Sequence, residues 1–259
     1  MKDCVESPPP DLSLVVPCYN EEQLLDNSVR DLIAEFERHH VRIEVVLVDN
    51  GSRDRTGECI DELLAAGLPV IKRVVTVNQG YGNGILVGLA ACQGRWVGIV
   101  HADSQVEAAD VYKIYSLAQQ APQPCLVKAR RRFRMDGLKR KVVSILYNLI
   151  INVLYPGLGS IDVNSSPKLL PRRYLRAMNL VSRDWFVDPE IMIKARHLGL
   201  PVIEINVLAQ MRRGGKSNVN AHTCWEFVVN LCRWRLGGVG HLQQLEAAAG
   251  ELVAAKEST

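Results

Sequence analysis

Three side chains that can bind a cation or an anionic ligand follow a short apolar segment near the middle of the chain. They are His101, Asp103 and Gln105, and the segment before them, residues 96–100, is predicted to be a buried strand. Residues two apart on an extended backbone point the same way, so the three side chains can converge on one ligand. A strand that ends in an ordinary polar loop would show the same pattern. The elements around them are needed to choose between these interpretations.

Strands and helices are predicted to alternate through the first 105 residues. Apolar segments, several of them rich in β-branched residues, predict strands at 12–16, 44–48, 70–77 and 96–100. The intervening segments predict helices that begin at 24, at 56 or 57, and after the glycine-rich segment 80–84. This alternation favours an α/β fold with a mostly parallel central sheet and helices on both faces.

A polar cluster follows each of these four predicted strands, at 19–21, 49–52, 78–83 and 101–105. The carboxyl ends of parallel strands share one edge of a sheet, and ligands bind there where the strand order reverses. One cleft can therefore collect all four clusters. This supports the ligand-binding interpretation of His101, Asp103 and Gln105.

The second half of the chain is less regular. Helices are predicted at 107–119, 171–179, 188–198 and 221–236, and strands at 125–129, 163–170 and 201–208. Residues 142–154 are strongly apolar, with a polar stripe formed by Ser144, Asn148 and Asn152. This segment is about five residues short of the ~18 apolar residues that suggest a membrane span. We expect a helix buried in the core, with a helix in a membrane interface as the alternative.

The composition is that of a globular protein. The chain has 259 residues, 47% of them hydrophobic and 23% charged. Its seven cysteines are scattered without a CxxC pair, which predicts reduced thiols in a cytoplasmic protein and no disulfide framework or zinc site. Residues 1–11 lack the apolar stretch of a secretory signal and are expected to be a flexible lead-in.

The net charge of +3 is unevenly distributed. Residues 128–141 contain eight basic residues and one acidic residue, which is +7, so the rest of the chain carries −4. Such a segment suits phosphate ligands, an anionic membrane surface or nucleic acid, or else forms a solvated loop. Because no recognisable nucleic-acid-reading module accompanies it, we expect no nucleic-acid partner.

Four segments in order, each at a predicted strand end, resemble the motifs of family 2 glycosyltransferases. They are PCYNEE at 17–22, VDNGSRDRT at 48–56, NQGYGN at 78–83 and HADSQ at 101–105. The closest resemblance is to the dolichol- and polyprenol-phosphate sugar transferases. It continues through Arg131, 134–136, Asn148, Asp162, Glu190 and 212–218, and so covers about residues 12–220.

The resemblance implies a GT-A type fold and transfer of a sugar, with inversion, from a nucleotide-diphosphate donor. The glycosyltransferase domain would span 12–236, with a nucleotide-binding half at 12–105, an acceptor half at 106–236 and a C-terminal tail at 237–259. The implied contacts to the base and ribose are Pro17, Tyr19, Glu21 and Asp49. Gly80 and Gly82 would let the backbone pass close to the ligand. The other implied donor-binding residues are Asn20, Gly51, Asn78, Ala102, Arg134, Arg212 and Ser217, the last two in a segment similar to a mobile loop.

The family pattern Asp-x-Asp-x-Gln presents a divalent cation to the donor diphosphate, and this chain has His101 at the first position. The implied ligands are His101, Asp103 and Gln105, with Mn²⁺ or Mg²⁺ as the cation. A neutral imidazole suits Mn²⁺ better than Mg²⁺. A cation-independent or catalytically inactive variant stays open as an alternative.

The resemblance makes Asp103, Arg131 and Glu190 the candidate catalytic residues. A polyprenyl-phosphate acceptor is already an anion and needs little help from a base, and Arg131 could bind a phosphate. A soluble hydroxyl acceptor would need a carboxylate base, for which Asp188 or Glu190 is the candidate. Asp188-Pro189 also fits the N-cap and first residue of a helix.

The preferred hypothesis is an inverting transferase that acts on polyprenyl phosphate, cytoplasmic with peripheral contact at the inner membrane face. The alternatives are a transferase for a soluble hydroxyl acceptor and a non-catalytic nucleotide-sugar-binding protein.

Overall fold

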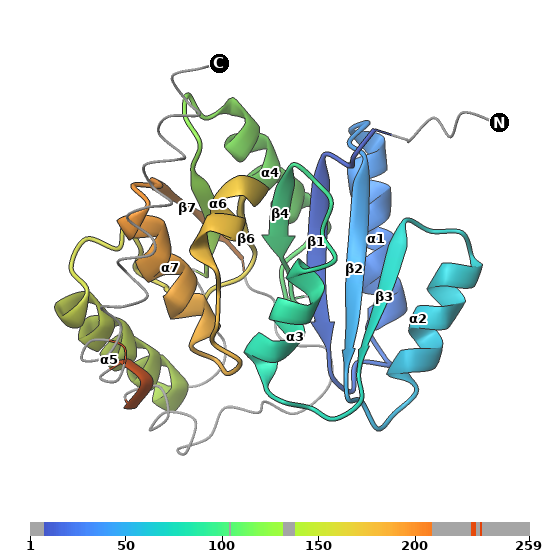
Figure 1. The fold of residues 1–259 in the computed structure, drawn as a ribbon, viewed down its shortest axis with the longest axis horizontal. Coiled ribbons are helices and arrows are strands. Elements are labelled where there is room, and N and C mark those ends of the chain that lie inside the picture. The colour runs from blue at the N-terminus through green and yellow to red at the C-terminus, as the bar shows by residue number, and fades with distance from the viewer. Residues whose placement is uncertain (1–7, 104, 132–137, 209–228, 232–233, 235–259) are drawn as a thin grey trace.

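The computed structural model describes residues 8–103, 105–131, 138–208, 229–231 and 234. Its centre is one seven-stranded sheet with the strand order β3-β2-β1-β4-β6-β5-β7 (Figure 1). The strands are β1 (Leu12–Cys18), β2 (Ile43–Asn50), β3 (Val70–Val75), β4 (Trp96–Ile99), β5 (Leu126–Arg131), β6 (Lys168–Pro171) and β7 (Val202–Val207). The helices are α1 (Leu25–Arg38), α2 (Thr56–Ala65), α3 (Tyr81–Leu89), α4 (Ala108–Gln120), α5 (Leu138–Leu154), α6 (Arg172–Met178) and α7 (Val187–His197).

The sheet is parallel except around β6. Strands β1, β2, β3 and β4 pair in parallel, as do β5 and β7, whereas β6 runs antiparallel to both β4 and β5. In register, Leu12 lies opposite Ile43 on one side and Trp96 on the other. The strand order reverses between β1 and β4, so the switch point lies at the carboxyl ends of these two strands, toward the lower edge of Figure 1.

Alternate residues of the central strands build a core on each face of the sheet. Val15 and Val46 pack in a cluster with residues of α3, α6 and α7, and Leu14 and Val45 pack in a second cluster with residues of α1 and α4. All four of these side chains are fully buried. This arrangement follows from the two-residue period of a strand whose faces are both covered. The predicted α/β class, with a mostly parallel sheet and helices on both faces, is confirmed.

The strand predicted at 163–170 is mostly wrong. Only Lys168–Pro171 forms β6, because the preceding residues turn sharply, with the backbone N–H of Ser165 donating to the carbonyl of Asp162 at 3.0 Å. This turn surrounds the buried side chain of Lys128. Polar groups of the turn bind that lysine instead of pairing with a neighbouring strand.

Helix α5 begins at Leu138. We expected this helix to be buried in the core, but only one of its faces is covered. Tyr147 and Ile151 are buried, but the opposite face exposes Ile145 at 57%, Leu149 at 59% and Val153 at 71%. Apolar composition alone could not show that only one face is covered. Within the described residues, we find no helix with both the length and the apolar character needed to span a bilayer. The helix predicted at 221–236 and the tail from 237 lie largely outside the described residues.

Candidate active site

The polar segments that follow β1, β2 and β4 meet at the switch point of the sheet. Tyr19, half-buried, comes directly after β1, and Asp49 lies at the end of β2 opposite Cys18 in register. His101 follows β4 by two residues. The expected convergence of these strand ends on one edge is therefore present, with Pro17 inside β1 one residue before its end.

Side chains of the first two clusters shape each other's loops. Asn20 is in a left-handed conformation (φ 56°), and its Oδ1 accepts from the backbone N–H of Arg53 at 2.8 Å. Asp49 Oδ1 accepts from the N–H of Ser52 at 3.0 Å. The backbone N–H of Glu21 donates to Thr56 Oγ1 at 2.9 Å. Asn20 and Asp49 thus hold the loop between β2 and α2 in place.

Gly51 and Asn78 join the second and third clusters. Gly51 has φ 74°, and a Cβ atom there would lie 2.6 Å from the backbone nitrogen of Asn78. Asn78 Oδ1 in turn accepts from the N–H of Gly80 at 2.8 Å. Glycine is therefore required at 51 by backbone conformation and by close approach.

The glycines at 80 and 82 closely approach protein backbone. A Cβ atom at Gly80 would lie 2.5 Å from the carbonyl oxygen of Arg183, and one at Gly82 would lie 2.5 Å from that of Asp184. The N–H of Asn83 donates to the same Arg183 carbonyl at 2.8 Å. These glycines let the start of α3 pack tightly on the segment 182–184, and their expected closeness to the donor stays a prediction.

Three aromatic rings stack beside the end of β4. The rings of Tyr81 and His101 have centroids 5.4 Å apart, and Tyr81 stacks on Trp185 with centroids 4.5 Å apart. The Tyr81 hydroxyl lies 3.4 Å from Nε2 of His101. The stack connects the end of β4, through α3, to the segment before α7.

Burial lowers the pKa of the His101 imidazole below its usual range, against the opposing charges of Asp103 and Asp188. Arg131 and Lys168 act in the same direction as burial. The imidazole is therefore neutral at pH 7 and can offer a lone pair to a metal ion.

The donor set of His101 and Asp103 fits a divalent cation only with added ligands. Asp103 Oδ1 accepts from the backbone N–H of Gln105 at 3.2 Å, which orients the carboxylate. Within the described residues no three His, Cys, Asp or Glu side chains gather as a metal site. A neutral imidazole, one carboxylate and the Gln105 amide oxygen are ligand types that would suit Mn²⁺. Ala102 is buried, at 3% exposure, and its predicted contact with the donor stays a prediction.

Arg131, at the end of β5, is held by a bidentate ion pair. Its Nε and one terminal nitrogen donate to the two carboxylate oxygens of Asp162, both at 3.0 Å. The next residue, Val163, donates its N–H to Oδ1 of Asn148 on α5 at 3.1 Å. The polar stripe of α5 therefore positions the loop that fixes this arginine.

The carboxylates of α7 are both buried in ion pairs. Asp188 is bound by the ammonium group of Lys168, and Glu190 accepts from Lys194 Nζ at 2.6 Å. Glu190 is fully buried and also accepts from the backbone N–H groups of Val181 and Ser182.

The expectation that Asp188 caps α7 is wrong, because the helix begins at Val187 and Phe186 is its N-cap. The burial of Glu190 also argues against its candidate role as a general base. Its contacts make it a positioning residue for the segment 181–182.

The family assignment rests on a sequence comparison. The sequence model described as glycosyl transferase family 2 matches residues 13–175, more than half of the chain. The chain belongs to this family.

Two similar proteins are named as transferases for lipid phosphates. A dolichyl-phosphate beta-glucosyltransferase from Trichomonas vaginalis is 30% identical over 81% of this chain and 68% of its own length. An undecaprenyl-phosphate 4-deoxy-4-formamido-L-arabinose transferase from Pseudomonas syringae is 33% identical over 54% of this chain, and the match covers 41% of that protein. The chain thus spans less than half of the latter.

A solved structure shows the same fold. Glucosyl-3-phosphoglycerate synthase from Mycobacterium tuberculosis, in complex with Mn²⁺, UDP and glucosyl-3-phosphoglycerate, superposes with a TM-score of 0.70. It is 22% identical, and the match covers 88% of this chain and 80% of that chain. The predicted GT-A architecture of this family 2 protein is confirmed.

Sequence reasoning missed the buried lysines of this family 2 site. Lys168 is the first residue of β6, and Lys128 follows two apolar residues in β5. Lys128 Nζ donates to Ser165 Oγ at 2.7 Å and to Glu204 at 3.1 Å, and it also contacts the carbonyl of Asp162. The sequence carried only a weak signal, a lysine beside apolar strand residues, because lysine is rarely buried without a partner. The predicted residues Arg134, Arg212 and Ser217 lie outside the described residues.

Proposed function

We propose that this protein transfers a sugar from a nucleotide-diphosphate donor to a polyprenyl phosphate, with inversion at the anomeric carbon. The names of the relatives, which are undecaprenyl-phosphate and dolichyl-phosphate transferases, support this acceptor class. The Mn²⁺ and UDP in the solved neighbour support the donor class.

The observation that carries the acceptor proposal is the burial of both α7 carboxylates in ion pairs. A hydroxyl acceptor must lose a proton to a base, whereas a phosphate oxygen is already anionic. Asp188 is 3% exposed and forms an ion pair with Lys168. Glu190 is fully buried and forms an ion pair with Lys194. Both carboxylates are therefore out of contact with solvent and already bound to an ammonium group, which favours an acceptor that needs no base.

In the proposed step, an acceptor phosphate oxygen bonds to the anomeric carbon of the sugar. The bond from that carbon to the donor diphosphate breaks, and its electron pair leaves with the nucleoside diphosphate. Arg131 would bind phosphate, since Asp162 holds its guanidinium in one orientation. His101, Asp103 and Gln105 would hold the cation, which when bound would neutralise charge on the leaving group.

The exposed face of α5 supports acceptor delivery from a membrane. Ile145, Leu149 and Val153 recur at four-residue spacing on this face, and each is more than half exposed. The basic segment 128–141 runs into the start of the same helix. Apolar side chains beside basic residues are typical of a helix lying in an anionic membrane surface. The inner face of α5 contacts the loop that holds Arg131, so the helix lies next to the proposed acceptor site.

The test is transfer in reconstituted vesicles. Vesicles containing polyprenyl phosphate, or polyprenol as the matched hydroxyl acceptor, are incubated with UDP-, GDP- and dTDP-sugars in Mn²⁺, Mg²⁺ or EDTA. We expect product with one donor base, with the phosphate acceptor only, and loss of product in Asp103→Ala. Transfer to polyprenol or a soluble hydroxyl would contradict the acceptor proposal. Donor binding without transfer to any acceptor would favour the non-catalytic alternative.

A further inference from the structure

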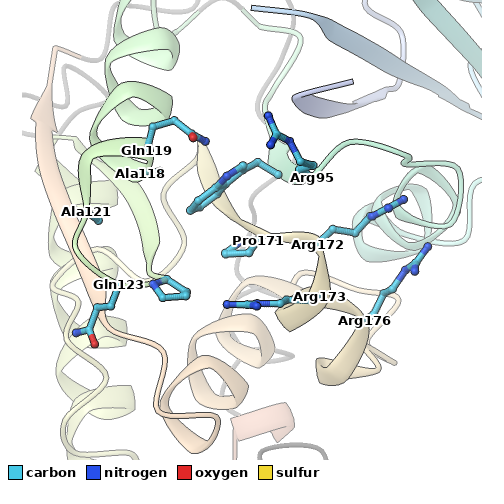
Figure 2. Close-up of a pocket in the computed structure, with 11 residues that line it drawn as sticks. Arg95, Ala118, Gln119, Ala121, Gln123, Pro171, Arg172, Arg173 and Arg176 are labelled. Atoms are coloured by element: carbon cyan, nitrogen blue, oxygen red, sulfur yellow. The ribbon is translucent and has the colours of Figure 1, made fainter. Parts of the chain in front are cut away.

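A hollow lined by arginines lies at the edge of the sheet opposite the candidate active site. Its volume is about 660 Å³. It is bordered by the start of β4, the end of β6, the start of α6 and the connection from α4 to β5 (Figure 2). The lining residues used below are Arg95, Trp96, Gln119, Arg172, Arg173 and Arg176.

The hollow is separate from the donor cleft. Trp96 begins β4 and His101 follows its carboxyl end. Five residues of extended chain, at about 3.3 Å per residue, put about 16 Å between them. The hollow therefore cannot share a ligand with the His101 and Asp103 pair unless that ligand spans the whole sheet.

The strand pairing forces two arginines together. Trp96 lies opposite Pro171 in the antiparallel pair of β4 and β6, so Arg95 and Arg172 meet at the end of the ladder. The backbone N–H of Arg172 donates to the carbonyl of Arg95 at 2.9 Å. Like charges placed opposite each other in this way are destabilising.

Helix α6 adds further positive charge. Arg172 and Arg176 are four residues apart on this helix, a spacing at which like charges repel, and Arg173 and Arg176 are exposed. Figure 2 shows the side chains of Arg172 and Arg176 extending to one side of the hollow and that of Arg173 pointing to the other.

No acidic residue lines the hollow, and among the described residues only Arg95 of this group forms an ion pair, with Asp11 at 2.7 Å. Arg172 donates to the carbonyl of Cys92 at 3.3 Å, and the guanidinium of Arg173 lies 5.4 Å from the ring centroid of Tyr174, so in the described part of the chain these two arginines have polar or aromatic contacts but no carboxylate partner.

We propose that this hollow binds a small, soluble polyanion that carries two or more phosphate or carboxylate groups. Guanidinium groups match such oxygens with paired hydrogen bonds, and Trp96 supplies an apolar wall. The volume is within the range of about 300–1,000 Å³ typical of small-molecule sites. The hollow lies at the edge of the sheet opposite the carboxyl ends of the parallel strands. Its ligand would therefore lie on the solvent side if α5 meets a membrane.

The test is calorimetric titration of the full chain with tripolyphosphate in EDTA, which avoids a cation-dependent contribution from the donor cleft. The test variant is Arg173→Gln/Arg176→Gln, both at exposed positions, and circular dichroism checks that it is folded. Arg38→Gln/Arg73→Gln, at exposed arginines of α1 and β3, is the matched control for loss of two charges. We expect at least tenfold weaker binding in the double variant and unchanged binding in the control.

Three results would overturn the proposal: no binding to the unmodified chain, equal binding to the double variant, or loss of binding in Arg131→Gln of the active site. None of them depends on sugar transfer, so this inference and the proposed function fail separately.

Discussion

The rings of Tyr81 and His101 are nearly parallel, at 19° with centroids 5.4 Å apart, at the point where β4 delivers its metal-binding candidates. This contact holds the imidazole between the start of α3 and the end of β4. Since Tyr81 also stacks on Trp185, the orientation of His101 depends on both halves of the molecule.

Replacing His101 by aspartate should change which cation supports donor binding. The substitution adds a negative charge and a hard oxygen ligand, which Mg²⁺ prefers over an imidazole nitrogen. We expect the ratio of donor Kd values in Mg²⁺ and Mn²⁺ to shift about tenfold toward Mg²⁺, or about 1.4 kcal/mol. Calorimetric titration of the donor in each cation measures the ratio. His39→Asp, at a histidine outside the site, is the matched control.

An unchanged ratio in His101→Asp would exclude His101 as a ligand. If sugar transfer appeared only in the variant, the native chain would be a nucleotide-sugar-binding protein and not an enzyme.

Glu190→Gln should destabilise the fold and only secondarily affect transfer. Lys194 would lose its charged partner in a fully buried site, and breaking a buried pair costs about 3 kcal/mol or more. Denaturant unfolding measures the loss. Replacing both partners, in Glu190→Met/Lys194→Met, should restore part of the stability because no unpaired charge remains. The control Glu58→Gln, at an exposed ion pair, should change stability by less than about 1 kcal/mol.

The opposite pattern would restore the general-base hypothesis for Glu190. That pattern is normal stability in Glu190→Gln together with complete loss of transfer and a changed pH profile of kcat.

Charged substitutions on the exposed face of α5 should weaken membrane binding. Leu149→Glu/Val153→Glu places two carboxylates where the helix would meet apolar chains and anionic headgroups. We expect at least tenfold less binding to anionic vesicles in a flotation assay. Val74→Glu, at a valine on β3 that is 57% exposed, is the matched control and should float like the unmodified chain. Equal flotation of all three proteins would remove α5 as the contact surface.

The first half of the fold could be predicted because its signals are local. Strands β1, β2 and β4 are mainly apolar, β3 is rich in β-branched residues, and each is followed by a polar cluster whose place on the sheet edge follows from parallel pairing. His101 and Asp103 could be assigned to one site for the same reason. The family motifs then added roles that periodicity alone does not carry.

The second half depends on partners far apart in the sequence. The place of Asp188 is set by Lys168, twenty residues earlier, and not by the helix start that Asp-Pro suggested. The short β6 results from a turn that encloses Lys128, and the exposed face of α5 depends on what the neighbouring elements leave uncovered. Gly82 required glycine because of the carbonyl of Asp184, a contact that no local pattern reveals.

The buried amine of Lys128 should make stability rise with pH in an alkaline window. Burial lowers the pKa of this amine from 10.5 to about 8, and the charge of Lys168 acts in the same direction. Between these values the unfolded chain binds more protons than the folded protein, so the free energy of unfolding increases with pH. Below the folded pKa both states hold the proton, and this contribution no longer changes with pH. The slope for one proton is at most about 1.4 kcal/mol per pH unit. Denaturant unfolding of the native protein and of Lys128→Met, over a pH series that begins below the folded pKa and ends above the unfolded one, measures the contribution as a difference in which other titrating groups largely cancel. We expect the stability of the native protein relative to the variant to rise with pH, whereas a flat or falling difference would mean that Glu204 keeps the amine charged throughout the window.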